Sequence, residues 1–391
     1  MWTLIVCLVT AVVLVTMVLS VYSVARLTGG QRAPARAAAP RVEGISVLKP
    51  LCGADDSLED NLAGFFVQEG ATYELVFGVE GEGDPAVEVV RRLRERYPAV
   101  AVRLVIHDGG RALNPKVSNL QAMLGAADHD MVVVSDSNVA VPADWLARMA
   151  ADFDAMDKPG LITNLFVGTG EESLGATFEN LHLAGPVAGS IAVSHVLGPN
   201  AATVGKSMMF RQSVLYGLGG LESLGSVLAE DYVMGRMFTE AGLSVRLATC
   251  PVANVCTNHR VSAFLKRHAR WGLIRSRVMP LIYAAEPLFN PMLPVVLGLA
   301  HGGAVGDVLV TVGLLTTLAR DAAQWIMLRG PRGLIRALPL GPIKELMILG
   351  VWVVTPFFGR VTWRGKRFRV GAGTRLYATA PISAPTRWSC E

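Results

Sequence analysis

The chain has 391 residues, of which 51% are hydrophobic, and its formal net charge is only +4. It is too apolar for an ordinary soluble protein and too charged in its middle for a simple bundle of membrane helices, which predicts one globular domain joined to membrane segments. The sequence has no basic stripe interleaved with aromatic residues and no nucleic-acid-binding motif, which argues against a nucleic-acid partner. The five cysteines form no CxxC pair and have no zinc-site spacing, so we expect reduced thiols.

The amino-terminal segment is predicted to be an uncleaved membrane anchor. Residues 2–25 carry no formal charge, and as a helix they would extend about 36 Å, enough for a hydrocarbon core of about 30 Å. Four arginines follow at once: Arg26, Arg32, Arg36 and Arg41. By the positive-inside rule this flank is cytoplasmic, which places the catalytic region of a multi-pass membrane protein in the cytoplasm. Residues 26–43, rich in Ala, Pro and Arg, are predicted to be a linker.

Strand and helix patterns alternate from residue 44 onward. The predicted strands are residues 45–51, 73–79, 100–108, 131–134, 161–168, 202–211 and 243–248. Helical patterns separate the first four strands, at residues 55–66, 84–97 and 114–127. This alternation predicts an α/β fold with a mostly parallel, Rossmann-like sheet over residues 44–260. The hydrophobic segment 172–197 fits a membrane-surface helix, the lining of an acceptor site or a buried helix equally well.

The carboxyl-terminal third is predicted to be membrane-associated. Residues 261–283 contain a basic amphipathic helix with a tryptophan, typical of the membrane interface, and we expect His268 to be exposed there. Within residues 284–359 and just before them, three apolar segments could span a bilayer: 281–300, 305–328 and 338–358. Three spans would put the basic tail, residues 360–391, outside, against its charge. One segment is therefore expected to be re-entrant or interfacial. Glu286, Asp307 and Asp321 fit poorly in lipid, so at least one span is expected to be imperfect or buried in protein.

A polar cluster follows the strand at residues 131–134. Asp136 and Asn138 stand just beyond the carboxyl end of this strand, where open α/β sheets bind ligands. A carboxylate and a second oxygen ligand there could hold a divalent cation against a nucleotide diphosphate. The alternative is a strand followed by a polar turn, with Asp136 capping the next helix.

Other polar residues sit just after predicted strands or at helix starts. They are Asp84, Lys116, Asn119, Asp231 and the RHARW segment with Arg267, Arg270 and Trp271. Asp84 and Asp231 could instead be helix caps, and the arginines could face phospholipid headgroups. Together, however, these residues are what a nucleotide-sugar transferase needs. Because a metal-bound carboxylate is a poor proton acceptor, Asp136 is assigned to the metal and Asp231 to the general base.

The order Asp84, Asp136, Asp231 and RxxRW resembles the D, D, D, (Q/R)xxRW signature of membrane-bound inverting GT-A glycosyltransferases. Six fragments in order resemble the ceramide glucosyltransferase family more narrowly, from about Ile45 to Pro291: SVLKPLCGADDSLEDNL, GDPAVEVVRRL, NPKVSNL, SDSNVAVPADWL, AEDYVMG and RHARW. One departure is Asn138, which stands where a DxD motif has its second acid.

The resemblance implies a GT-A fold that moves glucose from UDP-glucose to the primary hydroxyl of ceramide in the bilayer, with Mg²⁺ or Mn²⁺. It implies that Asp84 binds the nucleotide, that Asp136 is the acid of a degenerate DxD and that Asp231 is the base. Lys116, Asn119, Arg267, Arg270 and Trp271 would bind the donor. Three alternatives stay open: a related enzyme acting on a hopanoid or other lipid, perhaps with UDP-N-acetylglucosamine, a processive polysaccharide synthase, and a non-catalytic scaffold. No residue distinguishes glucose from galactose.

Overall fold

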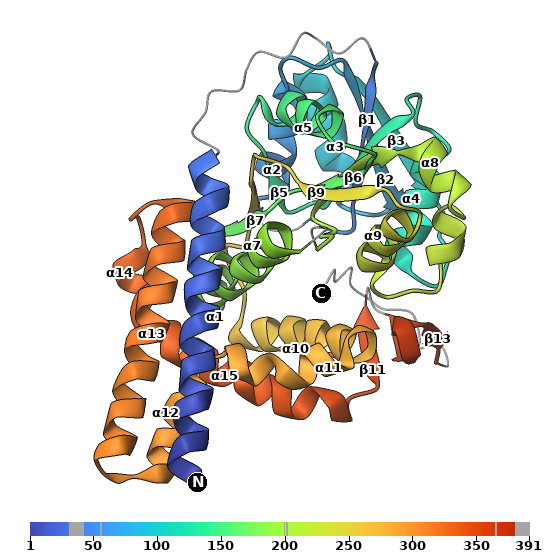
Figure 1. The fold of residues 1–391 in the computed structure, drawn as a ribbon. Coiled ribbons are helices and arrows are strands. Elements are labelled where there is room, and N and C mark those ends of the chain that lie inside the picture. The colour runs from blue at the N-terminus through green and yellow to red at the C-terminus, as the bar shows by residue number, and fades with distance from the viewer. Residues whose placement is uncertain (31–42, 55–56, 199, 201, 364–365, 380–391) are drawn as a thin grey trace. The chain divides into compact units, whose positions relative to one another are not determined.

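The computed structural model describes residues 1–30, 43–54, 57–198, 200, 202–363 and 366–379 (Figure 1). Contacts divide the chain into two compact units, which are described separately. The sheet unit consists of Gln31–Phe166, Gly198–Val255 and Arg360–Glu391. The helical unit consists of Met1–Gly30, Val167–Leu197 and Cys256–Gly359. The strand β7 (Phe166–Thr169) lies at a boundary between them in sequence.

A seven-stranded sheet with the order β3-β2-β1-β4-β8-β6-β9 forms the centre of the sheet unit. Its strands are β1 (Ile45–Pro50), β2 (Tyr73–Glu80), β3 (Ala101–His107), β4 (Met131–Ser135), β6 (Pro159–Thr163), β8 (Ser207–Arg211) and β9 (Ser244–Leu247). All neighbours pair in parallel except at β8, which is antiparallel to both β4 and β6. The predicted α/β class with a mostly parallel sheet is therefore confirmed.

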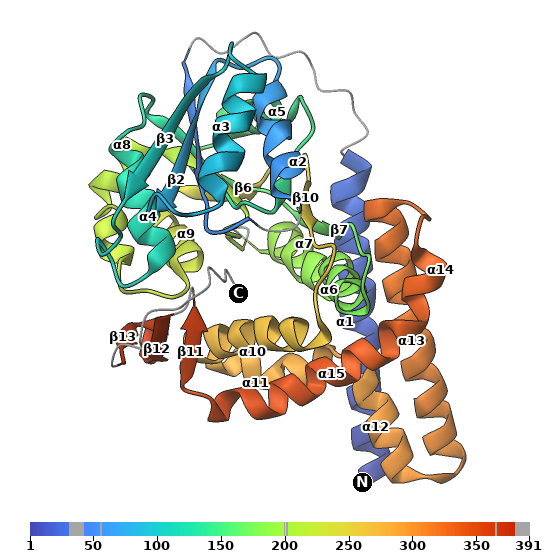
Figure 2. The same cartoon turned by 180° about the vertical axis from the view of Figure 1, so that it is seen from behind.

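Helices flank the strands of this sheet, and the first three in the chain fall within the predicted helical segments 55–66, 84–97 and 114–127. They are α2 (Leu58–Ala63), α3 (Ala86–Arg96), α4 (Pro115–Leu124), α5 (Trp145–Asp154), α8 (Gln212–Gly217) and α9 (Glu230–Glu240). Figure 2 shows α3 in front of β2 and β3. Of the predicted helix 55–66, only α2 is an α-helix, and a 3₁₀ turn, Gly64–Val67, continues it. A short strand pair, β5 (Val139–Ala140) and β10 (Val252–Val255), lies beside the sheet.

The carboxyl-terminal segment folds into a small sheet that the sequence analysis did not predict. The expectation for residues 360–391 was only a basic tail. Three antiparallel strands occur instead: β11 (Arg360–Trp363), β12 (Lys366–Val370) and β13 (Leu376–Ala378). Phe368 and Val370 are buried, so this arginine-rich segment has an alternating apolar face.

The helical unit contains several apolar helices. They are α1 (Trp2–Gly30), α6 (Leu174–His182), α7 (Ala188–Leu197), α10 (Val261–Val278), α11 (Pro280–Ala285), α12 (Met292–His301), α13 (Gly303–Arg329), α14 (Leu334–Ala337) and α15 (Gly341–Val354). Among the described residues, three helical segments are long and apolar enough to cross a membrane, Trp2–Gly29, Gly303–Arg329 and Leu334–Phe357. In both views α15 lies crosswise to α13 (Figures 1 and 2).

Two breaks interrupt the expected helices. A π-helical turn, Leu183–Val187, joins α6 to α7 around Pro186, whose missing N–H weakens regular α-helix there. The segments Pro280–Phe289 and Met292–His301 meet at 67°, so the predicted segment 281–300 is a bent pair of helices, the form of either a broken span or a re-entrant loop. Asn290 stabilises this bend, because its side chain accepts from the Met292 N–H and donates to Glu345.

Charged groups inside the helical unit pair with one another. Asp321 is buried and accepts from Arg320 at 2.8 Å and from Lys344 at 2.9 Å, whereas Asp307 is exposed. Arg320 also donates to Glu345 at 2.6 Å. Two carboxylates and two cationic side chains thus neutralise one another's charge inside the protein rather than facing lipid. Charged groups are tolerated in a membrane in this arrangement.

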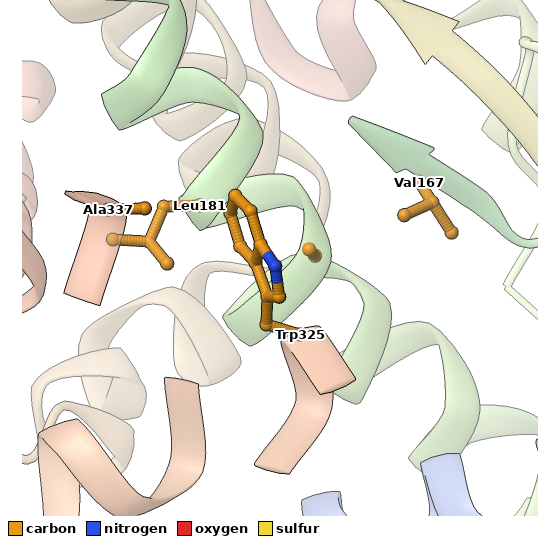
Figure 3. Packing of buried hydrophobic residues seen from close by; sticks show 5 residues of the cluster. Val167, Leu181, Trp325 and Ala337 are labelled. Carbon is orange, nitrogen blue, oxygen red and sulfur yellow. The ribbon is translucent and has the colours of Figure 1, made fainter. Parts of the chain in front are cut away.

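An apolar cluster around Trp325 packs segments of the helical unit that are distant in sequence. Figure 3 shows the indole of Trp325 beside Leu181 and Ala337, with Val167 nearby. The indole N–H donates to the carbonyl of Arg332 at 3.0 Å, so the one polar atom of this fully buried side chain is satisfied.

Candidate active site

The antiparallel pairing of β4 and β8 brings Asp136 and Lys206 together. Ser135 pairs with Ser207, so the residue after β4 faces the residue before β8. The Asp136 N–H donates to the Lys206 carbonyl at 3.2 Å. The ammonium of Lys206 then lies 3.1 Å from one carboxylate oxygen of Asp136. Lys206 is not among the site residues predicted from the sequence, because nothing in one sequence indicates which strand pairs with β4.

A second ammonium group binds the other oxygen of Asp136. Lys116, in the first turn of α4, has its Nζ 3.0 Å from Asp136 Oδ1. Burial alone would raise the pKa of the Asp136 carboxyl, but Lys116 and Lys206 outweigh it and hold this pKa well below its ordinary value. Asp136 is therefore an anion at every physiological pH.

Asn138 extends this cluster. Its side-chain oxygen accepts from Lys206 Nζ at 2.8 Å, and its side-chain nitrogen donates to Asn254 at 3.2 Å. The residue that departs from a DxD motif therefore still directs an oxygen toward the cluster. Its neutral amide brings less negative charge than a second carboxylate would.

The start of α4 connects Asp136 to the start of α9. Asn114 caps α4 by accepting from the backbone N–H groups of Lys116 and Val117, which fixes the first turn. Lys116 Nζ also lies 3.1 Å from Glu230. Burial lowers the pKa of Lys116, but Asp136, Glu230 and Asp231 together raise it above its ordinary value. Burial, only partly offset by Lys116, raises the pKa of Glu230.

Asp231 is held against the chain segment that leads into β8. Its Oδ2 accepts from the Gly205 N–H at 2.8 Å and its Oδ1 from the Tyr232 N–H at 2.8 Å. A Cβ at Gly205 would lie 2.9 Å from Asp231 Oδ2 and 3.1 Å from Lys116 Nζ. Gly205 thus contacts both Asp231 and Lys116, and Lys116 in turn binds Asp136, so these three predicted residues lie in one site.

Lys49 supports the site from within the core and was also missed. This residue at the end of β1 is fully buried, and its Nζ donates to the Asp136 carbonyl at 2.6 Å. The ammonium lies 3.7 Å from the ring centre of Phe65, a cation–π contact. Burial lowers the pKa of Lys49 well below its ordinary value, although Asp136 opposes this. The residue anchors the turn after β4.

Asp84 and Asn119 bind backbone groups of the sheet unit. Asp84 accepts hydrogen bonds from the N–H groups of Gly53 and Ala86. It therefore fixes the loop that follows β1 and caps the first turn of α3. Asn119 is fully buried and donates to the carbonyls of Leu51 and Gly78, bridging the ends of β1 and β2. Both residues thus shape the carboxyl end of the sheet, and their contact with a donor stays a prediction.

The RxxRW residues belong to the helical unit, on α10. Arg267 lies 3.2 Å from Glu179 of α6, a fully buried acid that sequence analysis did not assign. Burial would raise the pKa of Glu179, but Arg267 and His268 lower it to about 2. His268 is buried rather than exposed as expected, because it packs against Glu179, and its ring meets that of Trp271 at 5.2 Å. Glu179 and His268 therefore orient the first and last residues of the motif.

The donor chemistry of the site fits a divalent cation bound with a diphosphate. No group of three or more His, Cys, Asp or Glu in the described part of the chain could hold a metal alone. Asp136 and Asn138, however, supply oxygen donors, the kind that Mg²⁺ and Mn²⁺ prefer. The carboxyl groups of Asp136, Glu230 and Asp231 meet the ammonium groups of Lys116 and Lys206 here, so the cluster has little positive charge to spare for a diphosphate. A cation would restore the balance.

The sequence model of the family "Glycosyl transferase family 21" matches residues 5–376, nearly the whole chain. The chain belongs to glycosyl transferase family 21. The predicted relationship to ceramide glucosyltransferases is thereby confirmed. Ceramide glucosyltransferase 1 and 3 of Caenorhabditis elegans are each 31% identical to this family member, over 64% and 63% of the chain. Ceramide glucosyltransferase of Komagataella phaffii is 35% identical over 28% of it.

The chain of this family 21 member spans about half the length of the C. elegans relatives, 53% of each. Among solved structures, the mannosyltransferase PcManGT of Pyrobaculum calidifontis, with GDP-Man and Mn²⁺, is similar with a TM-score of 0.48 and 18% identity, covering 91% of this chain and 99% of its own. Glucosyl-3-phosphoglycerate synthase of Mycobacterium tuberculosis, with Mn²⁺, UDP and phosphoglyceric acid, gives 0.37 and 15%, covering 61% and 78%.

Proposed function

We propose that this family 21 member transfers glucose from UDP-glucose to the primary hydroxyl of ceramide, with inversion, giving β-glucosylceramide. The observation that carries the proposal is the convergence of Lys116, Asp136 and Asp231 around Gly205. Single-displacement glycosyl transfer requires a cationic group beside the diphosphate, a carboxylate that can bind a metal ion and a separate carboxylate that acts as the base. The ceramide glucosyltransferase relatives support the choice of donor and acceptor.

In the proposed step, Asp231 takes the proton of the acceptor hydroxyl as its oxygen attacks the anomeric carbon. The bond from that carbon to the diphosphate oxygen breaks, and UDP leaves with the electron pair. Gly205 N–H keeps the Asp231 carboxylate in place, while Lys116 and Lys206 supply positive charge beside the leaving group. Asp84, Asn119, Arg267, Arg270 and Trp271 keep their predicted roles in donor binding as part of this proposal.

Asp136, aided by Asn138, would hold Mg²⁺ or Mn²⁺. When bound, the cation would neutralise the diphosphate of the leaving UDP. Binding it requires Asp136 to loosen its contacts with the two lysines, which could then turn toward phosphate oxygens. EDTA should therefore abolish most turnover, and added Mg²⁺ or Mn²⁺ should restore it. Full activity in EDTA would show that the lysines suffice for the leaving group.

The membrane arrangement is part of the proposal. The described tail, up to Thr379, belongs to the sheet unit, and Val227 pairs with Arg375. The tail and the sheet must then share one side of the membrane, which we place in the cytoplasm. An even number of crossings between residues 255 and 360 satisfies both this pairing and the basic charge of the tail. A cysteine introduced at Tyr377 should react with an impermeant maleimide only from the side that exposes the sheet unit.

The decisive experiment is UDP release by the full chain in membranes, with UDP-glucose and with or without ceramide. We expect release to depend on ceramide and β-glucosylceramide to form. Turnover with UDP-N-acetylglucosamine or with a hopanoid but not with ceramide would replace this proposal by the related lipid transferase. Acceptor-independent polymer formation would point to a polysaccharide synthase, and the absence of turnover with any donor to a scaffold.

A further inference from the structure

The loop that precedes Asp231 forms a strand-like pairing with the carboxyl-terminal tail. The Leu376 N–H donates to the Ser226 carbonyl at 2.8 Å, and the Leu228 N–H donates to the Thr374 carbonyl at 3.0 Å. Between these bonds, Val227 and Arg375 form an antiparallel bridge. The tail, more than a hundred residues later in sequence, therefore fixes the backbone that leads into α9.

The side chain of Thr374 adds a contact closer to Asp231. Its hydroxyl oxygen accepts from the Ala229 N–H at 3.3 Å, two residues before the proposed base. Thr374 is fully buried and Ala229 is nearly so, so water cannot replace this bond. The Ala229 N–H lies at the very start of α9, where helix N–H groups lack helical partners and need another acceptor.

The backbone of Thr374 has an unusual conformation, with φ of 61°. A β-branched residue rarely adopts this left-handed region, because its side chain crowds the backbone there. Asn or Gly would adopt it more easily, but neither has a hydroxyl at this position. The strained threonine is consistent with a requirement for its hydroxyl rather than for a turn residue.

The opposite side of the same loop is held by Asn114 at the start of α4. The Asn114 N–H donates to the Gly225 carbonyl at 2.9 Å, and its side chain donates to the Val227 carbonyl at 2.7 Å and to Glu230 at 3.3 Å. The loop thus lies between α4, which carries Lys116, and the tail, which carries Thr374. Its position relative to Lys116 is set from both sides.

We propose that Thr374 is a positioning residue that aligns the Asp231 carboxylate by fixing the first turn of α9. The proposal rests on the proposed function in one respect, the role of Asp231 as base. A small displacement of a catalytic group lowers the rate of the chemical step more than it lowers binding. Thr374 touches no reacting atom, and its effect reaches Asp231 through the Ala229 backbone.

The test uses the full chain in lipid nanodiscs and three variants. Thr374→Val keeps the shape and the β-branch but removes the acceptor oxygen, and Thr374→Ser keeps the oxygen. The matched control is Thr379→Val on the same tail, where the lost hydroxyl donates to the Arg367 carbonyl, its one hydrogen bond within the described residues. We expect Thr374→Val to lower kcat roughly 3- to 10-fold, the loss of about one hydrogen bond, with the KM for UDP-glucose unchanged. Thr374→Ser and Thr379→Val should stay close to the parent.

Amide hydrogen exchange gives a readout that does not depend on activity. In Thr374→Val, the amides of residues 225–232 should exchange faster than in the parent, and in Thr379→Val they should not. Unchanged exchange and kcat in Thr374→Val would overturn the proposal, as would equal losses in Thr379→Val. If the parent itself shows no turnover with UDP-glucose and ceramide, the proposed function fails, and the exchange data still decide whether Thr374 fixes this loop.

Discussion

Replacing Asp231 by asparagine removes the proposed general base while changing the side chain very little. The carboxylate now accepts two backbone N–H groups, from Gly205 and Tyr232, both at 2.8 Å. An amide has one oxygen and can accept only one of them well, so its NH₂ group must face the other N–H. The variant therefore tests catalysis and also carries a defined structural cost.

The two effects differ in size and in what they change. A positioned base contributes about 10²- to 10⁴-fold in rate, which corresponds to about 2.7–5.4 kcal/mol of transition-state stabilisation. The unsatisfied N–H costs about 1–3 kcal/mol of folding stability, less where the partly exposed side chain can reach water. We therefore expect kcat to fall by at least 100-fold, with modest thermal destabilisation.

The assay is single-turnover and steady-state UDP release in nanodiscs with ceramide, together with UDP binding by calorimetry. UDP affinity should change less than threefold, because Lys116, Lys206 and Asp136 are intact. Asp231→Ser, which offers no comparable carboxylate, controls for the misplaced amide. A kcat close to that of the parent in Asp231→Asn would refute the assignment of the base, and loss of UDP binding would show that Asp231 acts in donor binding instead.

Further predictions concern residues around the proposed base and the RxxRW motif. Lys206→Met removes one ammonium that lowers the pKa of Asp136, so this pKa should rise in an NMR titration of the carboxyl carbon; Lys206→Arg should leave it unchanged. Gly205→Ala should lower kcat roughly 10-fold or more, because the added Cβ crowds the Asp231 carboxylate. Gly83→Ala should leave kcat unchanged, because a Cβ there meets nothing within 4 Å. Glu179→Gln removes the fully buried acid of an ion pair whose arginine is partly exposed, and should cost about 1–3 kcal/mol of folding stability, measured by thermal unfolding with and without UDP; an unchanged melting temperature would contradict the pairing.

Local patterns in the sequence determine much of this protein. Apolar runs such as Met131–Ser135 are too short for helices and too apolar for loops, and they form the strands of the sheet. Asn114-Pro-Lys predicts the start of α4 because an asparagine cap followed by proline at the first turn is a local signal. The candidate acids were found in the same way, since Asp136 and Asp231 directly follow or begin such elements.

Only the tertiary structure decides what these residues contact. Lys206 reaches Asp136 through the antiparallel pairing of β8, and a strand pattern carries no information about its partner. Thr374 belongs to a basic tail whose short apolar alternation is masked by arginines, and its meaning depends on pairing with a loop far away in sequence. Hydrophobic period and capping are local properties that a chain displays along its length. Register and long-range pairing depend on the packing of the whole unit, which places the charges of this site around Asp136.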